Sequence, residues 1–262
     1  METDSLPRGG DSMRNLKITL AYDGFDFHGW QVQPGLMTVQ GSLSDALQRV
    51  TGERVLPQGS GRTDAGVHAL AQVASCAIAS PIPVSNLVVA LNDVLPGAVR
   101  VLKVEEAGAD FHARASVKAK TYRYRMWRGA ICPPFLARYV YHHPYPLDEL
   151  AMQAAAAAVI GRHDFTSFAA VDPERGREGE ELCNVRYLFS SAWQREGQEL
   201  IYTVRGQGFL HHMVRNLVGT FLLVGKGTLT AEDMGNILQA MNRSAAGPTA
   251  PPQGLYLVNV EY

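Results

Sequence analysis

Alternating apolar and polar positions predict a strand close to the start of the chain. Leu16, Ile18, Leu20 and Tyr22 are apolar, whereas the residues between them are polar or small, and this is the two-residue period of a half-buried strand. The same reasoning predicts helices over residues 39–50 and 84–91 and strands over residues 54–56, 70–78 and 99–104. This order of elements is typical of an α+β domain with a mostly antiparallel sheet.

The second half of the chain repeats this plan in the order of its elements. Strands are predicted over residues 119–127, 185–193, 199–205 and 255–260, and helices over residues 147–160 and 209–224. We therefore expect an α+β fold of two similar subdomains, each with a mostly antiparallel sheet flanked by helices, and a cleft between them. The predicted domains are residues 16–108 and 109–262, and the polar, glycine-rich residues 1–15 are expected to be a disordered tail.

A glycine-rich stretch over residues 59–69 leads into one of these strands. Its sequence, Gly-Ser-Gly-Arg-Thr-Asp-Ala-Gly-Val-His-Ala, contains three glycines, which permit tight turns and close backbone approach. The stretch is therefore predicted to be a loop that fixes the position of Asp64. The residues alone leave two interpretations open. Asp64 and Arg62 belong to a catalytic loop, or Asp64 bonds its own backbone in an Asx-turn and Arg62 pairs on the surface.

The net charge of −1 does not by itself indicate nucleic-acid binding, but the charges are unevenly distributed. No acidic residue occurs between Asp110 and Asp148, or in residues 200–231. The basic residues of these intervals are Arg114, Lys118, Lys120, Arg123, Arg125, Arg128, Arg138, Arg205, Arg215 and Lys226. Aromatic residues lie among them, and RNA binds to such combinations through its phosphates and unpaired bases. The sequence favours a basic cleft between the subdomains, although these arginines could instead pair with acidic residues elsewhere.

The cysteine and histidine patterns do not predict a metal site. The three cysteines are scattered, which indicates reduced thiols in a cytoplasmic protein. In the pairs His142-His143 and His211-His212, adjacent side chains point about 100° apart on a helix and to opposite faces on a strand. We therefore expect neither pair to chelate an ion. No segment reaches the about 18 apolar residues of a membrane span, and no signal peptide is expected.

Residues 62–69, Arg-Thr-Asp-Ala-Gly-Val-His-Ala, resemble the signature of the TruA family of tRNA pseudouridine synthases. Other blocks resemble that family in the same order. They include Tyr22-Asp23-Gly24, Gly29-Trp30-Gln31, Asp110-Phe111-His112-Ala113-Arg114, Tyr122-Arg123-Tyr124, His211-His212-Met213-Val214-Arg215-Asn216 and Gly254-Leu255-Tyr256-Leu257. The similarity extends over nearly the whole chain, so it is far more specific than a lone Arg-Thr-Asp would be.

The resemblance implies an isomerase that converts uridine to pseudouridine in tRNA without a cofactor or a metal. It implies that Asp64 is the catalytic carboxylate, that Arg215 pairs with it, and that Tyr122 stacks on the extruded base. The substrate contacts expected besides Tyr122 are Arg62, Arg114, Arg123, His211 and Leu255. The family acts on the anticodon stem-loop at about positions 38, 39 and 40 by tRNA convention. The resemblance also implies that the protein is a homodimer in the cytoplasm.

Two departures from the family pattern and two competing functions remain. Ala71 stands where the family often has glycine. Cys183 stands where the family often has arginine, so that an RNA contact at residue 183 is absent or comes from Arg186.

A non-catalytic RNA-binding or RNA-chaperone protein would share the basic intervals but would not need Asp64. A metal-dependent nuclease or phosphotransferase would use Asp64 and His68, but it would also need further clustered carboxylates.

Overall fold

The computed structural model describes residues 13–171 and 183–262, and within them ten strands form one sheet. The strands are β1 (Arg14–Tyr22), β2 (Gln58–Gly59), β3 (His68–Ile78), β4 (Val99–Ala107), β5 (Ala119–Trp127), β6 (Tyr141–His142), β7 (Gly161–Asp164), β8 (Val185–Glu196), β9 (Glu199–Gly206) and β10 (Leu255–Glu261). Their order is β4-β1-β3-β10-β5-β9-β8-β7, with β2 beside β3 and β6 beside β5. Only the β10–β3 and β5–β6 pairs of the described strands are parallel. The predicted α+β fold with a mostly antiparallel sheet is confirmed.

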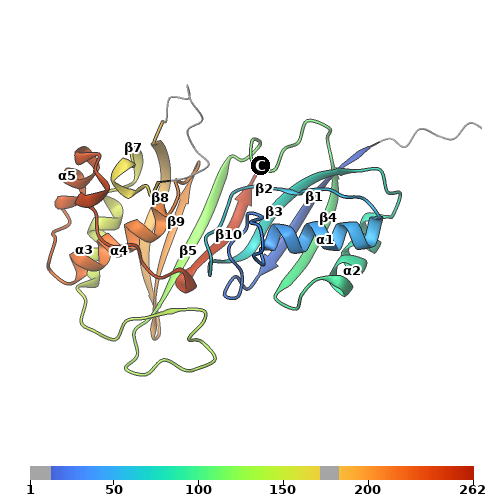
Figure 1. Cartoon of the computed structure of the whole chain (residues 1–262). Coiled ribbons are helices and arrows are strands. Elements are labelled where there is room, and N and C mark those ends of the chain that lie inside the picture. Colours follow the sequence, from blue (N-terminus) through green and yellow to red (C-terminus); the bar gives the residue numbers. More distant parts are fainter. Residues whose placement is uncertain (1–12, 172–182) are drawn as a thin grey trace, which may run out of the picture.

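The position of β10 joins the two halves of the molecule (Figure 1). β10 pairs with β3 of the first half through Tyr256 opposite His68, and with β5 of the second half through Leu257 opposite Tyr122. The strands of both predicted domains therefore belong to one continuous sheet. The register also brings the end of the glycine-rich loop, which enters β3, close to the tyrosine of β5. The division at residues 108 and 109 stays a prediction.

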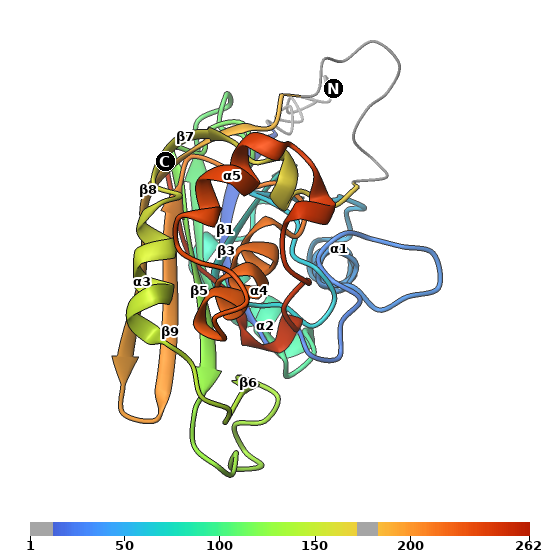
Figure 2. The same ribbon diagram turned by 90° about the vertical axis from the view of Figure 1, so that its left-hand side faces the viewer.

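The helices of the described residues are α1 (Val39–Thr51), α2 (Val84–Val94), α3 (Glu149–Ala157), α4 (Met213–Gly225) and α5 (Asp233–Ala240). In the first half α2 packs on β4 and α1 on α2, whereas in the second half α3 packs on β8 and on α4. Figure 2 shows α1 and α4 on the same side of the strands. None of the helices in these ranges has the length and apolar character that crossing a membrane requires.

The buried side chains follow the pattern of the sequence. Leu16, Ile18 and Leu20 of β1 have no exposed surface, and the same is true of Leu43 and Leu47 of α1. Thr38 caps α1 by accepting a hydrogen bond from the backbone N–H of Gly41. Each such apolar side chain contributes about 1.5–3 kcal/mol when it is removed from water. This core therefore fixes the strand that precedes the functional loops.

Several element boundaries differ from the prediction for identifiable reasons. β1 begins at Arg14 rather than at residue 16, so residues 14 and 15 are not part of a tail, whereas residues 1–12 lie outside the described part. The prediction of a strand over residues 54–56 is wrong, and these residues form an irregular connection. Their segment is bonded to side chains of α1 instead of to a strand, because the Val55 carbonyl accepts a hydrogen bond from Ser44 and the Pro57 carbonyl accepts one from Gln40. Residues 172–181, an acidic stretch whose sequence indicates a solvated loop, also lie outside the described residues.

Candidate active site

The glycine-rich loop connects β2 to β3 and is held by hydrogen bonds from the first half of the chain. The Thr63 hydroxyl lies 2.8 Å from the hydroxyl of Tyr22, and the Thr63 carbonyl accepts a hydrogen bond of 3.0 Å from the backbone N–H of Trp30. The Asp64 carbonyl accepts one of 3.1 Å from the N–H of Val67. The carboxylate of Asp64 therefore projects from a loop whose backbone is fixed on both sides.

The segment between β1 and α1 supports this loop through two close glycine contacts. A Cβ atom on Gly24 would lie 1.8 Å from the carbonyl oxygen of Val67. Gly29 has a φ of +84°, and a Cβ atom there would lie 2.6 Å from the Thr63 carbonyl oxygen. The Nδ1 atom of buried His68 accepts a hydrogen bond of 3.1 Å from the backbone N–H of Gly24. The Tyr22-Asp23-Gly24 and Gly29-Trp30-Gln31 blocks thus act as a support for the glycine-rich loop that carries Asp64.

A Gly24→Ala substitution should displace this support and destabilise the protein by about 3 kcal/mol or more, because only backbone atoms could move to relieve the clash. Denaturant unfolding measures the change. The matched control is Gly235→Ala in α5, where a Cβ atom has no neighbour within 4 Å. That control should be neutral or stabilising by up to about 1 kcal/mol. Equal stability of the two variants would contradict the supporting role of Gly24.

Asp64 forms an ion pair with Arg215 across the two halves of the chain. Arg215 Nη1 donates a hydrogen bond of 2.8 Å to Asp64 Oδ2, and Arg215 Nε donates one of 2.7 Å to the Ala250 carbonyl. The Arg215 side chain is 13% exposed and that of Asp64 is 19% exposed. Because the guanidinium is held from two sides, it fixes the direction in which the carboxylate points. The structure thus joins the two residues that the family resemblance assigns to catalysis.

Two histidines complete the surroundings of this carboxylate. His211 Nε2 lies 3.6 Å from Asp64 Oδ1, and His212 Nε2 lies 3.4 Å from Asp64 Oδ2. Burial is the largest cause of the lowered pKa of His212. The expectation that adjacent histidines point apart is wrong for this pair. α4 begins only at Met213, and His212 has a left-handed φ of 58°, so the two rings come within 4.0 Å of each other.

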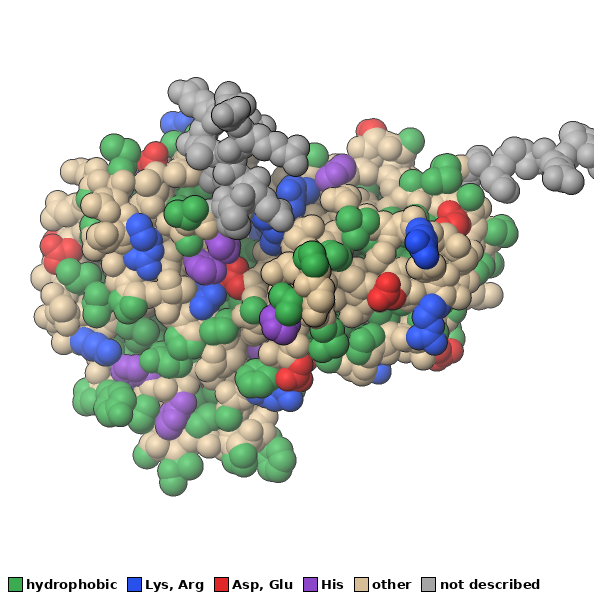
Figure 3. Space-filling model, in the orientation of Figure 1, with side chains coloured by type: hydrophobic (Ala, Val, Ile, Leu, Met, Phe, Trp, Pro, Cys, Tyr) green, Lys and Arg blue, Asp and Glu red, His purple; other side chains and the backbone are tan. Residues whose placement is uncertain are grey.

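A cavity of about 510 Å³ opens beside the ion pair. Its basic lining residues are Arg62, Arg114, Lys120 and Arg186, and Asp64 is the only acidic residue among the described residues that line it. The lining also includes the histidine pair and the apolar residues Val67, Tyr122, Phe209, Leu210, Met213, Val214 and Leu255. Figure 3 shows basic and histidine side chains around a hollow near the centre of this face. A cavity of this charge and size suits a nucleotide with its phosphates.

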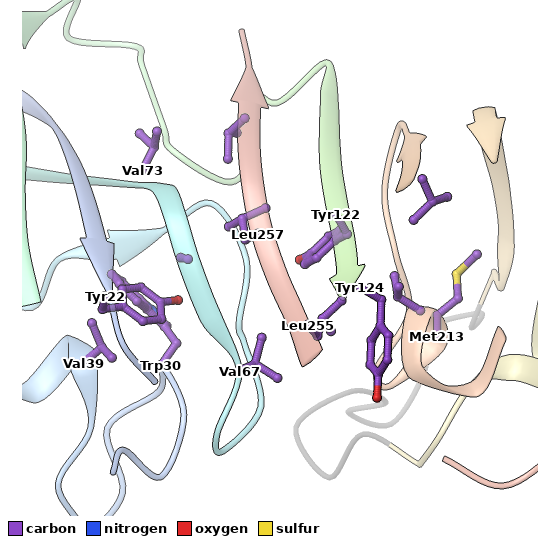
Figure 4. Close-up of a cluster of buried hydrophobic side chains, with 14 of the residues drawn as sticks. Tyr22, Trp30, Val39, Val67, Val73, Tyr122, Tyr124, Met213, Leu255 and Leu257 are labelled. Carbon is purple, nitrogen blue, oxygen red and sulfur yellow. The ribbon is translucent and has the colours of Figure 1, made fainter. Parts of the chain in front are cut away.

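Tyr122 and Leu255 form an apolar part of the wall. Figure 4 shows them projecting from the neighbouring strands β5 and β10. Tyr122 is 8% exposed, and the edge of its ring meets Phe209 with the centroids 4.9 Å apart. Burial, with smaller contributions from Tyr22 and Asp64, raises the pKa of the Tyr122 hydroxyl well above its ordinary value. The hydroxyl therefore keeps its proton and can donate a hydrogen bond.

Lys120 is a cavity residue that the sequence analysis named only among the basic residues of its interval. Its Nζ donates a hydrogen bond of 2.5 Å to the Ser60 carbonyl, at the start of the catalytic loop. Burial, followed by the charge of Arg114, lowers its pKa to about 8. No carboxylate of the described residues forms an ion pair with it, and buried cations are usually paired. An anionic ligand in the cavity would supply this missing partner.

The other predicted contacts divide between the cavity and a separate surface. Arg62, Arg114, His211 and Leu255 line the cavity, as expected for substrate contacts. Arg186 also lines it, and the suggestion that it compensates for Cys183 stays a prediction. Arg123 is not among the lining residues, since alternation along β5 places it on the face opposite Tyr122. Its role in RNA binding stays a prediction.

Comparison with known proteins agrees with these features. A family model described as tRNA pseudouridine synthase matches residues 18–114 and 155–262. The chain is 53% identical to tRNA pseudouridine synthase A of Solibacter usitatus, over 95% of this chain and 100% of that protein. It is 45% identical to tRNA pseudouridine synthase A of Halalkalibacterium halodurans, over 93% of this chain and 90% of that protein. A crystal structure of a Cbf5-Nop10-Gar1 complex aligns with a TM-score of only 0.33 at 10% identity, over 92% of this chain and 57% of that chain.

The family model covers the loop with Asp64, the helix with Arg215 and the strand with Leu255, while the two relatives extend over nearly the whole chain. Asp64, Arg215 and Leu255 are thus contained in the matched ranges, whereas Lys120 and Tyr122 lie between these ranges. The chain belongs to the TruA family of tRNA pseudouridine synthases.

Proposed function

We propose that this chain converts uridine to pseudouridine in the anticodon stem-loop of tRNA, at about positions 38, 39 and 40 by tRNA convention, with Asp64 as the catalytic group. The observation that carries the proposal is the Asp64–Arg215 ion pair of 2.8 Å at the wall of a basic cavity. The reaction is an isomerisation and needs neither an electron donor nor an energy source. The bond from ribose to uracil nitrogen breaks, the base turns, and a bond from ribose to uracil carbon forms.

The cavity walls support a mechanism that acts on an extruded base. A uridine within a stem must leave the stack before its glycosidic bond can be reached, at a cost of a few kcal/mol. Tyr122 and Leu255 then offer ring and aliphatic surfaces for the uracil. The Asp64 carboxylate acts as nucleophile or as general base toward the detached sugar, and Arg215 orients it. The proton lost from the uracil carbon is balanced by one gained at its nitrogen.

A substitution of Tyr122 by Phe should leave tRNA binding intact and slow the chemical step at least tenfold, about 1.4 kcal/mol in activation free energy. The ring that stacks remains, whereas the hydroxyl that can donate a hydrogen bond to the reacting nucleotide is lost. Single-turnover kinetics with saturating enzyme measures the effect, and Tyr145→Phe, which removes a hydroxyl from a residue that is 68% exposed, is the control. Unchanged single-turnover rates would limit Tyr122 to stacking.

Lys120 is proposed to bind a backbone phosphate of the target nucleotide. Lys120→Met should weaken binding to all tRNAs similarly and reduce the salt dependence of binding by about one phosphate contact. Because the pKa of Lys120 is lowered to about 8, wild-type binding should also weaken as the pH rises from 7 to 9 through loss of this proton. That change should be smaller in the variant. The control is Lys103→Met, whose 64% exposed side chain pairs with Glu105, and equal salt slopes for both variants would refute the contact.

We further propose a homodimer in the cytoplasm. A single chain presents one basic cavity, and a second copy would extend the basic surface over the length of a tRNA. Sedimentation of the protein alone and with tRNA tests this, and a monomer in both samples at micromolar concentration would refute the dimer.

The decisive experiment for the proposed function is base-resolved mapping of pseudouridine in unmodified tRNA incubated with the purified protein. Pseudouridine in the anticodon stem-loop is expected, and binding without modification would instead support an RNA-binding or RNA-chaperone protein. A nuclease that uses Asp64 and His68 is disfavoured, because His68 bonds to Gly24 and stacks on Tyr256 rather than lining the cavity. Activity that disappears with chelator would reverse that judgement.

A further inference from the structure

Three metal-ligating side chains converge at the wall of the cavity. A carboxylate oxygen of Asp64 and one ring nitrogen each of His211 and His212 all lie within 4.8 Å of one another. The left-handed φ of 58° at His212 makes this possible, because it turns the second imidazole to the same side as the first. Two imidazoles and one carboxylate form a donor set that zinc and neighbouring transition metals bind, whereas magnesium and calcium prefer oxygen ligands.

The hydrogen bonding of His211 aims a nitrogen at the carboxylate. His211 Nδ1 lies 3.1 Å from the Val171 carbonyl oxygen, and since a carbonyl can only accept, Nδ1 must carry the proton. In the neutral ring Nε2 then presents its lone pair to Asp64 Oδ1, 3.6 Å away. The lone pairs of His211 Nε2 and Asp64 Oδ1 face each other, and a cation between these two acceptor atoms stabilises the arrangement. Metal-binding histidines commonly donate their other ring N–H to a backbone carbonyl in the same way.

The distances also agree with direct coordination. Metal–ligand bonds of 2.0–2.2 Å at tetrahedral angles separate two donor atoms by about 3.4 Å. The separations are 3.6 Å from Asp64 Oδ1 to His211 Nε2 and 3.4 Å from Asp64 Oδ2 to His212 Nε2, so each carboxylate oxygen faces one histidine nitrogen. The side chain of His211 is 34% exposed, that of His212 is 28% exposed and that of Asp64 is 19% exposed. An ion can therefore enter from the cavity and keep water molecules at the coordination positions that the protein does not fill. Arg215, 2.8 Å from Asp64 Oδ2, repels a cation and so limits the affinity.

We propose that Asp64, His211 and His212 form a binding site for a divalent transition metal such as Zn²⁺, and that the bound ion reversibly blocks the catalytic carboxylate. The metal is an inhibitor in this proposal and takes no part in isomerisation. Only the inhibitory consequence rests on the proposed function, because binding of the ion depends on the three side chains alone.

Calorimetric titration of the metal-free protein with Zn²⁺ in the absence of RNA tests the site. One ion per chain is expected, and His211→Ala, His212→Ala and Asp64→Asn should each weaken its binding at least tenfold. The control is His163→Ala, whose imidazole lies on β7 beside the Ile160 carbonyl and outside the cavity lining. It should bind as the wild type does. Wild-type affinity in the double variant of His211 and His212, or no binding by the wild type, would overturn the proposal.

A second measurement does not depend on the folding of variants. Nitrogen NMR of the wild-type histidines should show Zn²⁺ shifting the two Nε2 resonances of His211 and His212 while leaving that of His163 in place. Shifts at other histidines alone would overturn the site. In turnover assays Zn²⁺ should inhibit the wild type and the His163→Ala control equally, and a chelator should restore the rate. Binding without inhibition would overturn the blocking role, whereas an enzyme inactive on tRNA would refute the proposed function and leave the calorimetric result to decide the site.

Discussion

Asp64→Asn is expected to abolish pseudouridine formation while the fold and tRNA affinity stay near those of the wild type. The carboxamide has the same shape and can still accept a hydrogen bond from Arg215, but it has no negative charge for nucleophilic attack or proton removal. General-base catalysis alone contributes about 10²–10⁴-fold, so a loss of at least about a thousandfold is expected. Single-turnover assays on unmodified tRNA, with circular dichroism to verify folding, measure this loss.

A matched control separates this effect from a general loss of charge near the site. Asp26→Asn removes a carboxylate that is 61% exposed and pairs with Arg138 outside the cavity lining, and it should keep nearly full activity. Substantial turnover by a well-folded Asp64→Asn protein would refute the proposed mechanism.

The second large effect is expected for Arg215→Met, which removes the cation and retains an apolar stem. A hydrogen bond to a charged group contributes about 1.5–3 kcal/mol, and if that is lost at the transition state the rate falls by about 10–150-fold. tRNA affinity should change much less, because Arg215 points at Asp64 and Ala250 rather than lining the cavity. The single-turnover rate at saturating enzyme measures the chemical step separately from binding.

Arg100→Met is the matched control for Arg215→Met. Arg100 bonds to the nearby carbonyls of Pro96 and Val99 on the edge strand β4, outside the cavity lining, so its loss should not affect the rate. A wild-type rate for Arg215→Met would mean that another cation, such as Arg62 of the cavity wall, supports Asp64.

The sequence predicted the elements whose pattern is local. The strand predicted over residues 119–127 is β5, and the buried side chains Tyr122, Tyr124 and Met126 alternate along it with less buried ones. The short helix α5 was missed, although Asp233 accepts hydrogen bonds from the N–H and hydroxyl of Thr230. A threonine followed three residues later by an acidic residue is a signal for the start of a helix, and Thr230 with Asp233 could have revealed α5. The helix predicted from residue 209 begins only at Met213, because the left-handed His212 ends the preceding turn.

The site was predictable only where the family motifs named it. The pairing of Asp64 with Arg215, which are 151 residues apart, follows from the resemblance and not from any local pattern. The contact of Lys120 with Ser60 and the convergence of His211 and His212 on one carboxylate depend on how distant segments meet. No spacing rule contains that information, because it depends on the register between strands and on one unusual backbone dihedral.

The position of β10 between β3 and β5 has a consequence for synthesis of the protein in the cell. β10 follows the other nine strands in the sequence, yet it is the strand that joins the Asp64 half to the Tyr122 half. While residues 255–261 are still within the ribosomal exit tunnel, the nascent polypeptide cannot close its sheet. Domains that emerge earlier can already fold. The strand with Tyr122 and the loop with Asp64 are therefore joined in one sheet only after residues 255–261 have left the tunnel.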